Sequence, residues 1–150
     1  MTTAPLYVID ASIGAKTVVR EPDSPLAVRF LRVAAAAGAL FLAPANYASE
    51  AANVLWKHCR LLGDLTWDEA EDGLRAMLAT PPVLYPLPLL AEHALQLALH
   101  FRRPVYDCFY VALAQRERCP LVTADRGLVN QLGDQFPNIL SLEQAAAGLP

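Results

Sequence analysis

The stretch Leu6-Tyr7-Val8-Ile9-Asp10 places four apolar residues in a row directly before one acid. Consecutive apolar residues put hydrophobic side chains on both faces of a strand, which is typical of a parallel sheet covered by helices. The stretch Pro120-Leu121-Val122-Thr123-Ala124-Asp125 repeats this arrangement near the other end of the chain. Two buried strands that each lead to an acid indicate an α/β protein.

The chain between and after these stretches alternates short apolar runs with longer helical patterns. We expect further strands over residues 40–42, 83–85 and 139–140, and helices over residues 12–19, 24–38, 44–63, 66–78, 89–101, 105–118, 128–132 and from 141 onward. The helix starts rest on local signals: Ser12 as a cap, Ser24-Pro25, Pro44 as a first helical residue, and a capping box at Thr66 and Glu69. The order β-α-α-β-α-α-β-α-α-β-α-β-α predicts a three-layer α/β/α sandwich with a central parallel sheet of four to five strands, in a single domain over residues 1–150.

The composition restricts the class of protein. Hydrophobic residues make up 55% of the 150 residues, enough for a substantial core. The net charge is −3, and no dense run of lysine and arginine marks a general cationic nucleic-acid binder. Three cysteines without a C-x-x-C spacing argue against a disulfide framework or a zinc site and favour a reducing cytoplasm.

Neither secretion nor a membrane span is indicated. Met1–Pro5 has no basic region of the kind that opens a signal peptide. The longest uncharged stretch, residues 33–49, is mostly alanine, contains glycine, proline and asparagine, and falls short of the roughly 20 apolar residues that a span requires. We expect a cytoplasmic protein.

Four of the fifteen acids lie in apolar surroundings, whereas most of the others have polar neighbours; the four are Asp10, Glu50, Asp107 and Asp125. A carboxylate in such surroundings is costly unless it is paired, hydrogen-bonded or bound to metal. Two of these acids follow strand ends, the edge where ligands bind in open α/β sheets. The other two are predicted near helix starts, Asp107 in the first turn and Glu50 in the second. We therefore expect the four to converge.

Such a cluster needs a cation. Two unit charges 4 Å apart repel by about 4 kcal/mol at an effective dielectric constant of 20, and we identify no obvious cationic partner beside any of the four in the sequence. Oxygen ligands without histidine or cysteine suit a hard ion, Mg²⁺ or Mn²⁺. One or two such ions, about 4 Å apart when paired, bind phosphates and activate water for hydrolysis.

Four motifs together resemble a PIN domain, with the VapC-type toxins of prokaryotic toxin–antitoxin pairs as the closest likeness. They are Val-Ile-Asp10-Ala-Ser12, Glu50-Ala-Ala-Asn53-Val-Leu, Tyr106-Asp107-Cys-Phe-Tyr110-Val-Ala-Leu-Ala, and Leu-Val-Thr123-Ala-Asp125-Arg-Gly-Leu. The resemblance implies a metal-dependent endoribonuclease, a homodimer, and an antitoxin that inserts a basic side chain into the acidic pocket. By this resemblance, the family's acidic site residues correspond to the four acids named above, and its hydroxyl residues correspond to Ser12 and Thr123.

The resulting hypothesis is hydrolysis of RNA phosphodiester bonds. Asp10, Asp107 and Asp125 would hold one ion, and Glu50 would bind a second ion or orient the nucleophile. Ser12 and Thr123 would hydrogen-bond a ligating carboxylate or a water on the ion.

Simpler interpretations stand beside these assignments. Asp10 and Asp125 can cap helices, Asp107 can favour the positive start of its helix, and Glu50 can lie on a solvated face. Arg102, Arg103 and Arg126 are candidates for contacts to RNA phosphates, or are simply solvated. Tyr106, Phe109 and Tyr110 are expected to pack in the core.

Two other functions remain open at this stage. One is an aspartate-based phosphotransfer enzyme or receiver-like domain, although the chain lacks an Asp-x-Asp at Asp10 and its only lysines are Lys16 and Lys57. The other is a non-catalytic interaction module, which would show no Mg²⁺-dependent cleavage of RNA.

Overall fold

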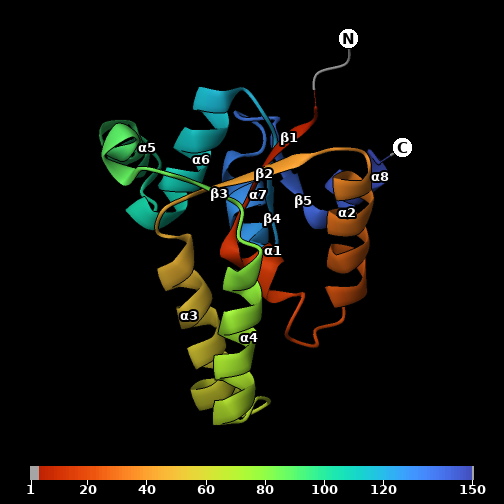
Figure 1. Ribbon diagram of the computed structural model, residues 1–150. Coiled ribbons are helices and arrows are strands. Elements are labelled where there is room, and N and C mark those ends of the chain that lie inside the picture. Colours follow the sequence, from red (N-terminus) through yellow and green to blue (C-terminus); the bar gives the residue numbers. More distant parts are fainter. Residues whose placement is uncertain (1–3, 150) are drawn as a thin grey trace.

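The structure, a computed structural model that describes residues 4–149, is built on one five-stranded sheet with all strands parallel (Figure 1). The strand order is β3-β2-β1-β4-β5. The strands are β1 (Leu6–Ile9), β2 (Leu40–Pro44), β3 (Val83–Tyr85), β4 (Leu121–Thr123) and β5 (Ile139–Ser141). The predicted parallel sheet and element order are confirmed. The expectation about a signal peptide falls largely on residues 1–3, outside the described residues.

Helices cover both faces of the sheet. On one side lie α2 (Ser24–Ala36) and α8 (Leu142–Ala147), and on the other lie α5 (Ala91–Phe101) and α6 (Val105–Glu117) (Figure 1). The 3₁₀ turn η2 (Leu87–Leu89) lies between β3 and α5, and the helix α7 (Arg126–Leu132) connects β4 to β5. Among residues 4–149, none of the helices has the length and apolar character needed to cross a bilayer.

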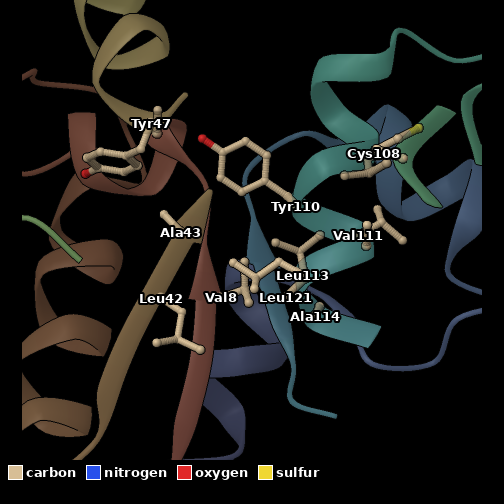
Figure 2. Close-up of a cluster of buried hydrophobic side chains, with 14 of the residues drawn as sticks. Val8, Leu42, Ala43, Tyr47, Cys108, Tyr110, Val111, Leu113, Ala114 and Leu121 are labelled. Carbon is tan, nitrogen blue, oxygen red and sulfur yellow. The ribbon is translucent and has the colours of Figure 1, made fainter. Parts of the chain in front are cut away.

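Strand β1 contributes to two separate cores because neighbouring residues in a strand face opposite ways. Val8 packs with Leu113 and Leu121 on the α6 side (Figure 2), while Ile9 packs with Phe30 on the α2 side. Val8 and Phe30 are fully buried. The continuous apolar run that predicted this strand therefore reflects burial on both faces.

A helical pair, α3 (Tyr47–Lys57) and α4 (Trp67–Ala79), runs away from the sheet beside the short helix α1 (Ala11–Ala15) (Figure 1). Helix α3 continues into a π-helical turn, η1 (His58–Leu62), which ends at Gly63 with a φ of 71°. The predicted capping box is present: the Thr66 hydroxyl accepts from the Glu69 amide, and the Glu69 carboxylate accepts from the Thr66 amide.

Two of the predicted helix caps and one predicted helix start are wrong. Helix α1 is capped by Asp10 rather than by Ser12 and ends at Ala15. The Ser24 hydroxyl donates to the Val19 carbonyl instead of capping α2. Pro44 is the last residue of β2, so α3 begins three residues later, at Tyr47. Proline has no amide hydrogen to donate, which suits the end of a strand as well as the start of a helix.

Candidate active site

The four acids line one cleft of about 310 Å³ at the carboxyl edge of the sheet. Strands β1 and β4 are neighbours, with Ile9 opposite Val122, so Asp10 and Asp125 follow adjacent strand ends. Asp125 also caps α7, and Asp107 lies in the first turn of α6, where it was predicted. Glu50 lies in the first turn of α3 rather than in the second, because α3 begins later than predicted.

Asp10 is held by the two hydroxyl residues that the sequence pointed to. One of its carboxylate oxygens accepts from the Ser12 hydroxyl and, at 3.2 Å, from the Ile13 amide, and the other accepts from the Thr123 hydroxyl. Burial raises the pKa of Asp10, and these hydrogen bonds act in the opposite direction. The net rise means that the ionised form of Asp10 is still short of compensating charge.

The same hydroxyls connect the two strand ends. The Thr123 hydroxyl accepts from the Asp125 amide at 3.0 Å, and the Ser12 hydroxyl accepts from the Ala124 amide at 3.3 Å. Thr123 is almost fully buried. The position of Asp10 is therefore fixed by side chains from both α1 and β4.

Glu50 is partly buried between α3 and α6. Its Oε1 accepts from the Asn46 amide group at 2.9 Å. Burial, reinforced by the charges of Asp10 and Asp107, raises the pKa of Glu50 to about 7, although Tyr110 lowers it. The Tyr110 hydroxyl reaches from α6 toward α3 (Figure 2), close enough to affect Glu50 but without a hydrogen bond of good geometry. This hydroxyl and the Asn46 Oδ1 are buried and find no partner among the described residues.

Arg103 joins the remaining two acids. Its Nη2 lies 2.7 Å from Asp125 Oδ2 and 3.1 Å from Asp107 Oδ2, and its Nη1 donates to Gln131 at 2.9 Å. Burial raises the pKa of Asp107, Asp125 raises it further, and Arg103 lowers it. The expectation that no cationic partner lies near the acids in the sequence is wrong. The four-residue spacing of Arg103 and Asp107 could have predicted this ion pair, although Arg103 lies in the α5–α6 connection and not on the helix itself.

The donor set fits a hard divalent ion. The cleft offers carboxylate oxygens from four segments, and burial raises the pKa of Asp10, Glu50 and Asp107, so a cation would stabilise their ionised forms. As the side chains stand, no three acid, histidine or cysteine side chains in the described part of the chain are grouped to surround one ion.

None of the three candidate RNA-contacting arginines is among the residues that line the cleft. Arg102 is exposed at the end of α5, and Arg126 is 84% exposed with only Glu143 nearby at 3.7 Å. Lys57 and Tyr106 line the cleft instead. Tyr106 is 65% exposed, so the expectation that it packs in the core is wrong, whereas Tyr110 is buried as expected.

Helical spacing could have identified further residues of the cleft. Asn53, Val54 and Lys57 follow Glu50 by three, four and seven positions, which places them on one face of α3.

Comparisons with known proteins agree with this fold. Residues 7–131 match the PIN domain family. Ribonuclease VapC3 from Pyrobaculum aerophilum is 37% identical over 136 residues, covering 89% of this chain and 97% of that protein.

Two solved structures are also similar. The crystal structure of PAE2754 from Pyrobaculum aerophilum has a TM-score of 0.69 at 25% identity, covering 96% of this chain and 88% of the other. VapC20 of Mycobacterium tuberculosis, described as a Sarcin-Ricin loop cleaving toxin, has a TM-score of 0.57 at 16% identity, covering 75% and 83% respectively, which shows a shared fold. With its parallel sheet, its matched residues and its close relative, this chain belongs to the PIN domain family.

Proposed function

We propose that this protein is a Mg²⁺- or Mn²⁺-dependent endoribonuclease and the toxin of a toxin–antitoxin pair. The observation that carries the proposal is the cleft in which a PIN domain gathers Asp10, Glu50, Asp107 and Asp125. The 37% identity to a protein named as a ribonuclease of the VapC type, over nearly the full length of both chains, supports the substrate class and the biological role.

The chain's own residues would bind and orient the reacting groups. One or two divalent ions in this cleft would activate water and stabilise the leaving oxygen of a phosphodiester. Asp10 is the most firmly held ligand, because Ser12 and Thr123 fix both of its oxygens. Asp107 and Asp125 would supply carboxylate oxygens from the α6 and α7 side of the cleft, and Glu50 would bind a second ion or orient the attacking water.

RNA would be held by groups at the cleft. Lys57 offers a positive charge for a phosphate, and the exposed ring of Tyr106 offers a face on which a base can stack. Arg126, which is exposed next to Asp125, can meet a phosphate further along the strand.

The proposed protein partners are an antitoxin and a second copy of the chain. An antitoxin would place a basic side chain among the four acids of the cleft. The large apolar side chains exposed on and after α3 and α4, Trp56, Leu61, Leu62 and Trp67, provide surface for protein contacts.

The direct test is cleavage of a mixed pool of structured RNAs by the purified chain. We expect cleavage with Mg²⁺ or Mn²⁺, none in EDTA, and a loss of at least about 100-fold for Asp10→Asn with circular dichroism unchanged, because a metal ligand is removed. Asp68→Asn, which removes an exposed acid on α4, is the matched control and should retain full activity. Cleavage by Asp10→Asn at the wild-type rate would refute the proposal.

Phosphotransfer through Asp10 has little support. The carboxylate is buried and both of its oxygens already accept hydrogen bonds, an environment unsuited to a nucleophile that must attack phosphorus. A failure to trap an aspartyl-phosphate with an activated phosphate donor would exclude it.

A further inference from the structure

Arg103 contacts two of the four acids that line the cleft. Its side chain is only 14% exposed, and a single nitrogen, Nη2, lies within 3.1 Å of carboxylate oxygens from both Asp107 and Asp125. The Nε atom also donates to Asp107 Oδ2 at 3.2 Å. The guanidinium therefore bridges an acid of α6 and the acid that caps α7.

This bridge uses oxygens that a metal ion would need. Asp125 Oδ1 accepts from the Leu128 amide at 3.0 Å, and Asp125 Oδ2, the oxygen without a backbone hydrogen bond, accepts from the cation Arg103. Among the described residues, no three potential ligands are grouped around one point. A divalent ion bound by Asp107 and Asp125 would compete with Arg103 for their oxygens.

We propose that Arg103 is a positioning residue that serves as the internal counter-ion of the metal-free cleft and releases Asp125 when a divalent ion binds. The inference rests on the proposed metal-dependent function and adds to it a residue that controls occupancy of the site.

Two physical features support this exchange. Without a cation, Asp107 and Asp125 would repel one another, and the planar arginine fork suits the neutralisation of two carboxylates. Gln131 gives the guanidinium a second anchor: it accepts from Arg103 Nη1 at 2.9 Å and donates to the Phe101 carbonyl at 2.6 Å. Arg103 thus retains a partner after it leaves Asp125.

The test is a Mn²⁺ titration without RNA, in which free Mn²⁺ is measured by electron paramagnetic resonance. Because Arg103→Gln removes the competing cation, we expect it to bind Mn²⁺ about tenfold more tightly than wild type, equivalent to about 1.4 kcal/mol. Arg118→Gln is the control: it removes one exposed positive charge at the opposite end of α6 from Asp107, and its Kd should stay within about twofold of wild type.

Thermal unfolding gives a second readout that a purely structural role would not produce. In EDTA, Arg103→Gln should unfold at a lower temperature than wild type because Asp107 and Asp125 repel, and saturating Mn²⁺ should remove that difference. An equal loss with and without Mn²⁺ would overturn the inference.

The outcomes separate this inference from the proposed function. An unchanged or weaker Mn²⁺ affinity in Arg103→Gln overturns the counter-ion role alone, whereas a wild-type chain that binds no Mn²⁺ overturns the metal-dependent function as well. If Arg103→Gln fails to fold, Arg103→Lys replaces it, because lysine keeps the charge without the fork. We expect this variant to bind Mn²⁺ about threefold more tightly than wild type, and an affinity no higher than wild type would overturn the inference.

Discussion

Thr123 shows how a single uncharged side chain supports the acidic cleft. Its hydroxyl donates to Asp10 and accepts from the Asp125 amide. Thr123→Val keeps the shape of the side chain but leaves one Asp10 oxygen without its donor. We expect metal-dependent RNA cleavage to fall about 10- to 100-fold, measured as kcat/KM at fixed Mn²⁺. Thr80→Val, at the exposed end of α4, is the control. Equal rates for the two variants would contradict a supporting role for Thr123.

Glu50 should make the metal-free protein less stable as the pH rises. Its pKa is raised to about 7 in the folded chain from an ordinary value of 4.5, so between these values the folded state binds more protons than the unfolded state. The free energy of unfolding must then decrease with pH across this window and level off above it.

The expected decrease between pH 4.5 and pH 8 is about 2 kcal/mol, less than the full shift would give because the carboxyl is partly solvated. The measurement is urea unfolding in EDTA. Glu50→Gln, which cannot titrate, should lack this part of the pH dependence. Parallel pH profiles for wild type and Glu50→Gln would show that the carboxyl is not perturbed in the folded chain.

At the scale of elements, the close packing of α1 against α3 depends on Gly14. A Cβ at this position would lie 2.0 Å from the Tyr47 hydroxyl oxygen and 3.2 Å from the ring carbon that carries it. We expect Gly14→Ala to lower the free energy of unfolding by about 2 kcal/mol, as is usual for overpacking.

Tyr47→Phe removes the closest of these contacts and should restore part of the lost stability. A double-mutant cycle by urea denaturation measures this coupling. If Gly14→Ala lowers the free energy of unfolding by the same amount in the wild-type chain and in the Tyr47→Phe variant, the strain does not come from the Tyr47 hydroxyl.

Local signals predicted most elements but not all of their ends. The Thr66–Glu69 capping box acts within one turn, and therefore its pattern was sufficient to place α4. Pro44 is compatible with both a strand end and a helix start, and only its pairing with β3 settles the choice. In the same way, Asp10 and Ser12 are both good caps, and the structure uses Asp10. The π-helical turn at η1 has no local pattern that would have predicted it.

At the scale of the whole molecule, we expect a homodimer. Large apolar side chains such as Leu95 and Leu99 are more than half exposed, which favours association. Sedimentation equilibrium at tens of micromolar should give twice the chain mass of 16.3 kDa. A single-chain mass under these conditions would contradict the expectation.

Contacts between residues far apart in the sequence were the hardest part of the site to predict. The strand-end positions of Asp10 and Asp125 predicted a shared sheet edge, because that rule holds for all open parallel sheets. The bridge from Arg103 to Asp125 was not predictable, because it spans 22 residues and depends on how the α5–α6 connection turns at Arg102, whose φ is 53°.

Strand β1 belongs to both cores and leads directly into Asp10. Deleting or inserting one residue within it would exchange Val8 and Ile9 between the two helical layers and move the carboxylate away from its hydroxyl partners at the same time. Folding and chemistry would be lost together, so this strand has almost no freedom to change length during evolution. Insertions should accumulate instead in surface connections, such as the one that follows η1.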